Sequence, residues 1–597
     1  MSALPIGLLL LLLLLVAAGA GVAVRVPASA PQRLLLAVLG GAVALHLLLT
    51  FYDLVGIRWS VPLLVFGLLA IAALGWRRPA PAPPTPRLGW GDAVALAGFS
   101  VFAWYGVAMV SLQSDFIWHW GIKAQRFLAV RHVDYAFLAR PWNWIYVPDY
   151  PNLYPELAAS VAMLAGRWRE VEQLTWSPVC LLLLFIGLRE PLAMAGVSTQ
   201  RRHAVVATMA LLCSAAAIVV GLAGGPECQL GLTLVAALPA LLRDPDPESD
   251  LQVGVCAAFA AASKLEGVAL GGFLVLVQLG RHLLRRRWPG LPSLVALCLL
   301  PGAVVLHWRL QVIRHHLEAV FHRGTPTWEH VQRGLPVLVG ATSTPSWHYA
   351  PWLLLLVPLL LRWRRLRPIA TVLLLQVAMY MWSYAAQPVD TVVLISSSWA
   401  RLLFHVLPAA LLALAIAALG DRAYLGEAAL ALGDGGERSS QGLFPLYNGR
   451  DNSERRYPVM HRDSFLPVAL FAGVLTFTAA VAAQTLGPSY ETLFVQGSAA
   501  YGAEDWSSCA ATLVKAAEMA PTERQAARAY FTAAACATAK GEKDAAFALL
   551  EKAAAKWILW EVDPSISDEE RVRWDVPPLS VARKRAEQLN AGTFQPH

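Results

Sequence analysis

The sequence has little charge. Only 15% of its 597 residues are Asp, Glu, Lys or Arg, whereas 57% are hydrophobic, and the mean hydropathy is +0.51. Soluble globular domains carry roughly 25% charged residues, so this composition excludes a soluble chain. Apolar runs of roughly 20 residues, the length that crosses a bilayer, recur from residue 5 to residue 484. The sequence therefore predicts an all-α polytopic membrane protein.

A continuous basic surface is also missing. The formal net charge is +8 and the pI is near 9.2, and such values occur in nucleic-acid-binding proteins. Here, however, the arginines stand in short clusters between apolar runs, such as RHLLRRR at 281–287 and RWRRLR at 362–367. Clusters of this kind mark the cytoplasmic side of a membrane protein. We therefore expect no nucleic-acid partner.

The sequence lacks the paired cysteine or histidine spacing of a zinc site. Seven cysteines are present, and we expect five of them, in hydrophobic segments, to be small packing residues: Cys180, Cys213, Cys228, Cys256 and Cys298. Cys509 and Cys536 lie in a polar tail, and the sequence leaves open whether they form a disulfide. No metal site is expected, and dependence on a divalent metal is left open.

The first apolar run, 5–23, lacks the basic n-region of a signal peptide and is longer than its usual apolar region. We therefore expect it to be a retained span. In all, the pattern predicts about 12–14 transmembrane helices. The predicted organisation is N-terminal helices in 1–89, a transmembrane core in 90–420, a cytoplasmic loop in 421–463, a last span in 464–484 and an exterior helical domain in 488–597.

Three polar segments of the core are expected to be exterior loops: 114–156, 307–349 and 385–401. Two places in the span count stay open. The apolar pieces 157–165 and 178–188 could make one net crossing or two short ones. The pieces on either side of the SKLEG step, residues 263–267, must be two crossings if that step faces outside. In the tail, 499–521 and 526–555 are expected to form two helix pairs, similar to a tetratricopeptide-like hairpin.

Asp115 lies at the start of the long polar break after the first spans, in SDFIWHWGIKAQRFL, just past a predicted span. An ionisable group at this depth is expensive and is a functional candidate by default. Lys123 and Arg126 follow at helical spacing. One interpretation is a juxtamembrane amphipathic helix with snorkelling bases. The other is a general base beside cations that neutralise a phosphate.

The same break ends in DYPNLYPE, 149–156, whose prolines predict a fixed turn that re-enters the bilayer. Farther along, Lys264 and Glu266 interrupt an apolar stretch, either as a mutual ion pair or as part of a site. Glu227 stands at a Gly-Gly-Pro break between two spans, as a solvated turn residue or as a cavity residue. Arg401 is expected to start a span, and an exterior arginine would suit a phosphate as well as an interface.

Together, SDFIWHWGIKA, DYPNLYPE, SKLEG and SSSWARLLFHVLP resemble bacterial membrane glycosyltransferases of the GT-C superfamily, of the protein O-mannosyltransferase and aminoarabinose-transferase type. The resemblance covers roughly residues 90–420. It implies a donor sugar linked to polyprenyl phosphate and a catalytic acid in the first large exterior loop, which maps to Asp115. Lys264 and Arg401 fall where family members carry bases that hold the donor phosphate. Unlike many members, this chain has Phe116 after the acid, and three spans precede the span that leads into the loop.

The site expected from the residues and the resemblance is therefore specific. Asp115 is the catalytic base, and the donor phosphate is bound by Lys123, Arg126, Lys264 and Arg401. The supporting cavity residues are His119, Asp149, Tyr150, Tyr154, Glu227 and Glu266. The predicted partners are the lipid-linked sugar, an exterior glycan, lipid or protein acceptor, and a protein bound by the tail. The predicted location is the bacterial inner membrane, with the site and the tail facing the periplasm.

Three other functions stay open at this stage. An O-antigen ligase or polymerase also uses lipid-linked glycans, but its centre would lie in the late exterior loop. A transporter or flippase would be favoured by two homologous halves, and no such internal repeat is visible in the sequence. A scaffold would act through the tail alone.

Overall fold

The computed structural model describes residues 6–75, 88–108, 115–139, 147–286, 288–317, 328–343, 347, 349–386 and 391–425, and in the tail 493–494, 496–497, 500, 505–520 and 523–561. Within these ranges the chain is helical and contains no strand. The predicted span 464–484 and nearly all of the predicted loop 421–463 lie outside the described residues.

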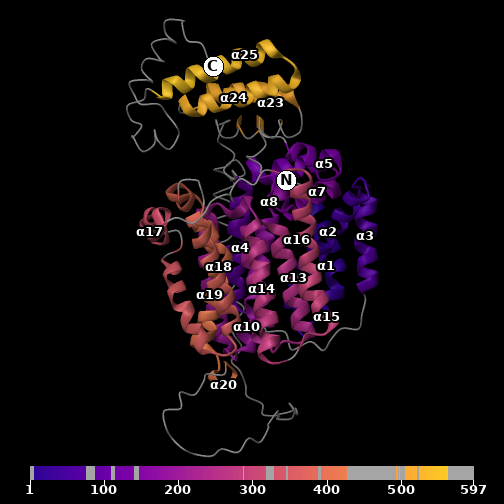
Figure 1. The fold of residues 1–597 in the computed structure, drawn as a ribbon, viewed down its shortest axis with the longest axis vertical. Helices are drawn as coiled ribbons and strands as arrows, with labels where there is room; N and C mark the ends of the chain where they lie inside the picture. The colour runs from indigo at the N-terminus through magenta and orange to yellow at the C-terminus, as the bar shows by residue number, and fades with distance from the viewer. Residues whose placement is uncertain are drawn as a thin grey trace, which may run out of the picture.

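Most of the described helices form one bundle with a single apolar core (Figure 1). Its first half consists of α1 (Ile6–Ala23), α2 (Ala30–Leu54), α3 (Val61–Gly75), α4 (Trp90–Ala108), the π-helical turn η2 (Phe116–Trp120), α5 (Gly121–Val130), α6 (Tyr135–Leu138), α7 (Leu153–Ala165), α8 (Glu170–Leu174), α9 (Trp176–Gly187), α10 (Arg189–Met194) and α11 (Thr199–Val220).

Its second half consists of η4 (Leu222–Gly224), α12 (Glu227–Leu242), α13 (Pro247–Ser263), α14 (Leu265–Leu284), α15 (Leu291–Leu294), η5 (Val295–Leu299), α16 (Leu300–Arg314), α17 (Trp328–Thr342), the 3-10 helix η7 (Ala350–Arg362), α18 (Arg367–Ala386), α19 (Thr391–Leu419) and α20 (Arg422–Leu425).

Eight segments of the described chain are long and apolar enough to cross a membrane. They are Ile6–Ala23, Ala30–Leu54, Glu170–Met194, Thr199–Val220, Leu265–Leu284, Leu291–Arg314, Arg367–Ala386 and Ser398–Leu419. Four shorter apolar helices accompany them, namely α3, α7, α12 and η7. The described part of the chain is thus helical and membrane-spanning, and the total of 12–14 spans stays a prediction.

The two open places in the span count have different structures. Residues 153–165 form the separate short helix α7, whereas α8, α9 and α10 run on as one candidate span, Glu170–Met194. Around SKLEG, α13 and α14 form an antiparallel hairpin, since a Cβ added at Gly267 would lie 2.0 Å from the carbonyl oxygen of Ala260, and Gln278 donates to Asp250 at 2.7 Å. Lys264 is therefore the extended residue at the turn of a hairpin.

Two predicted loops contain more helix than expected. Within 307–349, α16 continues to Arg314 and α17 occupies Trp328–Thr342. Within 385–401, α19 begins at Thr391, so Arg401 lies inside a helix and does not start one. The serines that suggested a loop are compatible with this helix, because the Ser398 hydroxyl donates to the Leu394 carbonyl at 2.6 Å, a bond that satisfies serine within a helix.

The bundle has two distinct ends in Figure 1, and we call them the α5 end and the α20 end. Helices α5, α7 and α8 lie at the α5 end, whereas α10, α15 and α20 lie at the other. Because α13 rises from its capped start at Asp246 to the Lys264 turn and α14 returns toward α15, this turn lies at the α5 end.

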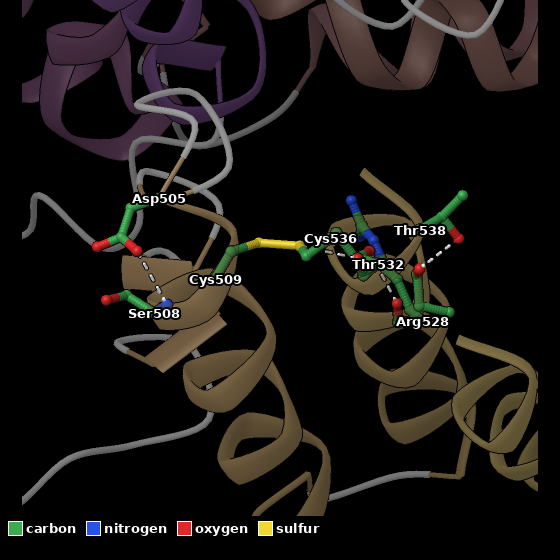
Figure 2. The surroundings of a disulfide bond; sticks show 8 residues. Asp505, Ser508, Cys509, Arg528, Thr532, Cys536 and Thr538 are labelled. Carbon is green, nitrogen blue, oxygen red and sulfur yellow. Dashed lines mark hydrogen bonds between the residues drawn. A yellow bond between two sulfur atoms is a disulfide. The ribbon is translucent and has the colours of Figure 1, made fainter. Parts of the chain in front are cut away.

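The described part of the tail has its own small core. Its helices are α23 (Trp506–Glu518), α24 (Glu523–Lys540) and α25 (Lys543–Glu561). Figure 2 shows a disulfide between Cys509 of α23 and Cys536 of α24, which are 27 residues apart in sequence. Closing a loop of this length stabilises the folded unit by roughly 3–4 kcal/mol. The first predicted helix pair contains the single long helix α23, and the tetratricopeptide-like repeat stays a prediction.

Candidate functional site

Five side chains from four distant parts of the sequence meet at the α5 end of the bundle. The guanidinium of Arg401 contacts Asp115 Oδ2 through Nη1 at 2.7 Å and Glu227 Oε1 through Nη2 at 2.9 Å. Lys264 Nζ lies 3.2 Å from the same Glu227 oxygen and 3.5 Å from Glu266 Oε1. We call these five residues the charged cluster. The structure thus brings together Asp115, Glu227, Lys264, Glu266 and Arg401, all of which the sequence singled out.

Each member of the charged cluster stands where a helix begins or inside a long one. Asp115 precedes η2, and Glu227 is the first residue of α12, directly after Pro226. Lys264 is the extended residue between α13 and α14, and Glu266 lies in the first turn of α14. Helix starts leave backbone N–H groups unpaired and favour negative charge. The three acids therefore lie at helix N-termini, where negative charge is favourable, and Arg401 contacts two of them from within α19.

Burial divides the charged cluster into an inner and an outer part. The side chains of Glu227 and Lys264 are 2% and 5% exposed, whereas those of Asp115 and Arg401 are 23% and 27% exposed. A buried charge is tolerated only when it is paired, so Glu227 is held firmly by two cations. The solvated-turn interpretation of Glu227 is therefore wrong.

The more exposed part of the charged cluster also contains polar atoms that are not hydrogen-bonded. Arg401 Nε and Glu266 Oε2 are buried atoms without a hydrogen-bond partner in the described part of the chain. Such atoms are costly when left unpaired and often mark where a ligand or water belongs. The outer part of the charged cluster therefore has unused polar capacity next to a half-exposed carboxylate.

Below Arg401, a neutral polar network closes the inner side of the charged cluster. His405 lies one helical turn after Arg401, and its Nδ1 forms a hydrogen bond of 2.7 Å with the Tyr380 hydroxyl. Gln376 donates to the same hydroxyl at 2.8 Å. Our sequence reasoning missed Tyr380 and Gln376 as site neighbours. Their spacing of four residues within an otherwise apolar span was the available sign, because it places both on one helix face.

Two predicted phosphate-binding residues point elsewhere. Lys123 is fully buried and donates to the Val147 carbonyl at 2.7 Å. Arg126 contacts Asp134 through Nη2 at 2.7 Å. The prediction assumed an uninterrupted α-helix from Asp115. The turn η2 is π-helical, so its i→i+5 bonding changes the helical phase and Lys123 and Arg126 do not enter the charged cluster.

Lys123 instead supports the turn that follows α6. Burial lowers the pKa of Lys123 to about 7, against the opposing effect of Asp149. Burial likewise raises the pKa of Asp149 to about 6, partly offset by Lys123. The Asp149 carbonyl accepts from Trp308 Nε1 of α16 at 2.8 Å. This turn is therefore fixed from two sides by buried polar groups.

Two predicted cavity tyrosines line the wall beside the charged cluster. Tyr150 is 8% exposed and packs on Trp120 at 5.9 Å between ring centroids. Burial raises its pKa well above the usual value, and the charges of Glu266 and Arg401 also act on it. Tyr154, in the first turn of α7, lies with its hydroxyl 3.5 Å from Ser177, which donates to the Gly225 carbonyl next to the α12 start.

The remaining predicted residues are placed as follows. His119 lies in η2 and is partly buried. The segment 149–156 is a turn only as far as Asn152, because α7 begins at Leu153 and includes Pro155 within its first turn, a position where proline costs no hydrogen bond. In the described ranges, no group of three or more His, Cys, Asp and Glu side chains is arranged to hold a metal ion.

The fold and the charged cluster define an all-helical polytopic membrane protein with a group of ionisable residues near one end of its bundle. No known protein family, curated protein or solved structure matches this chain.

Proposed function

We propose that the chain is a membrane glycosyltransferase that moves a sugar from a polyprenyl-phosphate-linked donor to an exterior glycan, lipid or protein. The observation that carries this proposal is the contact of Asp115 with Arg401, which in turn meets Glu227 and, through it, Lys264. Transfer from a lipid phosphate needs a base for the acceptor and cations for the leaving phosphate. The charged cluster offers both within one contact network.

In this proposal Arg401 and Lys264 bind the donor phosphate. The terminal nitrogens of both cations are already paired with carboxylates, so a phosphate that binds these nitrogens replaces one of the carboxylates. Glu227 is almost completely buried, whereas Asp115 is half-buried and contacts Arg401 through Nη1. The phosphate therefore takes the place of Asp115 on Nη1, while Nη2 of the guanidinium stays paired with Glu227. Donor binding would then release the Asp115 carboxylate for catalysis.

The reaction is a single displacement. The acceptor oxygen or nitrogen attacks the anomeric carbon, and the bond between that carbon and the phosphate oxygen breaks. Polyprenyl phosphate leaves with the electron pair, stabilised by Arg401 and Lys264, and Asp115 takes the acceptor proton. One displacement inverts the configuration at the anomeric carbon.

The proposed orientation places the charged cluster outside and the α20 end in the cytoplasm of a bacterial inner membrane. At the α20 end, the connections after α12, after α14 and before α18 carry arginines, among them Arg243, Arg285 and Arg365. Arginine-rich short connections favour the cytoplasmic side. The disulfide in the tail supports the same orientation, because disulfides persist in oxidising compartments.

The proposal is tested by transfer of a radiolabelled sugar from polyprenyl phosphate to membrane acceptors by the purified full-length chain. We expect transfer by the wild type and a loss of about 100-fold or more in Arg401→Gln, the scale for losing a transition-state charge partner. The control is Arg365→Gln, because Arg365 donates to the Leu242 carbonyl at the opposite end, and it should keep wild-type transfer.

Equal transfer by wild type and Arg401→Gln would refute the assigned site. If the intact lipid-linked sugar crossed the bilayer and no new glycoside formed, the chain would be a transporter and not a glycosyltransferase. Transfer of long preformed glycans only would favour the ligase or polymerase alternative.

A further inference from the structure

A small polar cavity lined in part by Tyr150 lies outside the charged cluster, and the proposed transfer does not use it. It is enclosed by α2, α16, the start of α7 and the segments at 133–135 and 148–152. Its space is about 10 Å³, roughly enough for one water-sized particle. The polar groups around it come from His46, Asp53, Asn152, Glu156, His307 and Gln311.

Four atoms around this cavity are buried and have no hydrogen-bond partner within the described chain. They are His46 Nε2, Asp53 Oδ1, Asn152 Oδ1 and Gln311 Oε1. His46 and Gln311 are 4% and 7% exposed. Buried polar atoms in native proteins are nearly always paired with protein or with a bound particle. Four of them around one small space indicate a missing occupant.

The available groups are mainly acceptors. Asp53 presents a carboxylate oxygen, and Asn152 and Gln311 present amide oxygens. His46 Nδ1 lies 2.7 Å from Glu156 Oε2, so Nδ1 carries the proton and Nε2 is left with its lone pair when the ring is neutral.

The number of acceptors selects the occupant. A water molecule can donate only two hydrogen bonds, which leaves two of the four atoms unpaired. A cation interacts with the three oxygen atoms at once, because hard cations prefer oxygen ligands. Two of the three unpaired oxygens belong to neutral amides, and no group of three His, Cys, Asp and Glu side chains suits a divalent metal in the described ranges. We propose that this cavity binds one monovalent cation, Na⁺ or K⁺.

The bound cation would connect parts that are far apart in sequence. Asp53 belongs to α2, Gln311 to α16, and Asn152 precedes α7 at the end of the turn that contains Tyr150. Its occupation would hold this turn, and thereby the wall of the charged cluster, in place. The inference concerns binding alone and stands independently of the transfer reaction.

The test is the thermal unfolding of the purified full-length chain in detergent at constant ionic strength, with choline replaced stepwise by Na⁺ or K⁺. A cation that binds only the folded state raises Tm saturably. We expect this rise in the wild type with at least one of the two cations, and the preferred cation identifies the occupant. Direct binding of radioactive Na⁺, or of Rb⁺ as a K⁺ substitute, should saturate at one per chain.

Gln311→Leu and Asp53→Asn should abolish the cation-dependent rise in Tm and the binding. The matched control is Gln173→Leu, because Gln173 is also a buried glutamine with unpaired amide atoms but does not line the cavity. It should keep both. Wild-type protein with equal Tm in Na⁺, K⁺ and choline and no bound cation would overturn the proposal. The same holds for a Tm that responds to pH but to neither cation, which would indicate a protonated Asp53 with water.

Discussion

Arg401 determines the geometry of the charged cluster, because it is the only cation there that touches both the half-exposed and the buried acid in the described structure. Its inner contact to Glu227 is shared with Lys264, so that carboxylate cannot leave without taking a partner from both cations, one of them buried. Its outer contact to Asp115 has no such restraint. The asymmetry explains how one arginine can remain in position while exchanging a carboxylate for a phosphate.

Lys123 leads to a pH-dependent stability. Its pKa is lowered by burial to about 7 from the usual 10.5, so between these values the unfolded chain binds the extra proton. The free energy of unfolding should therefore rise with pH from about 7 to about 10. Asp149, whose pKa is raised from 3.8 to about 6, contributes in another window, since its stabilisation decreases as pH rises from about 4 to 6.

Lys123→Met should remove the rise above pH 7, because it deletes the group that titrates there. The measurement is Tm of the full-length chain from pH 7 to pH 10. The control Lys515→Met, at an exposed position of α23, should keep the wild-type slope. A Lys123→Met chain with an unchanged slope would show that another group controls this pH dependence.

At the scale of elements, the α13–α14 hairpin positions Lys264. The two helices approach so closely that a Cβ at Gly267 would lie 2.0 Å from the Ala260 carbonyl oxygen, whereas one at Gly272 would have nothing within 4 Å. Small residues permit this approach in membrane bundles. Lys264, the turn residue, is therefore placed by backbone packing three residues away, at Gly267.

Gly267→Ala should force the hairpin apart, at a cost of about 1–3 kcal/mol, and should reduce transfer by displacing Lys264. Gly272→Ala, in the same helix, should be neutral or stabilising by about 0.5–1 kcal/mol. Thermal unfolding and sugar transfer of both variants provide the comparison. If both alanines behave alike, close packing at Gly267 does not position the lysine.

The elements also show how far the sequence could predict the site. Asp115, Glu227, Lys264 and Arg401 were recognisable singly, because ionisable groups at membrane depth are rare and costly. Their contact depends on the packing of four segments and could only be postulated. The phase change at η2 could not be read from FIWHW. Likewise, the early start of α19 depends on local serine bonding that the pattern ISSSWAR does not reveal.

At the scale of the whole molecule, the bundle has two chemically different ends. The charged cluster and the turn supported by Lys123 lie at the α5 end, and the arginine-rich connections lie at the α20 end. The apolar composition predicted the membrane-spanning helices well, because that pattern depends only on the solvent around them. Helix length and hydropathy do not determine which end faces outside. The proposed function places the α5 end outside.

This orientation predicts chemical accessibility. Val55→Cys, at an exposed position after α2 at the α5 end, should react with an impermeant maleimide in spheroplasts. Gln200→Cys, exposed in the first turn of α11 at the α20 end, should react only after permeabilisation. The unsubstituted chain provides the background. The reverse pattern of labelling would place the charged cluster in the cytoplasm.

The central claim is that Asp115 acts as the base at a site where Arg401 binds the donor phosphate. The most direct measurement compares polyprenyl-phosphate binding and sugar transfer by Asp115→Asn in one preparation. We expect binding equal to or tighter than that of the wild type, because the competing carboxylate is gone, and transfer reduced by about 100-fold or more. Wild-type transfer by Asp115→Asn would contradict the account.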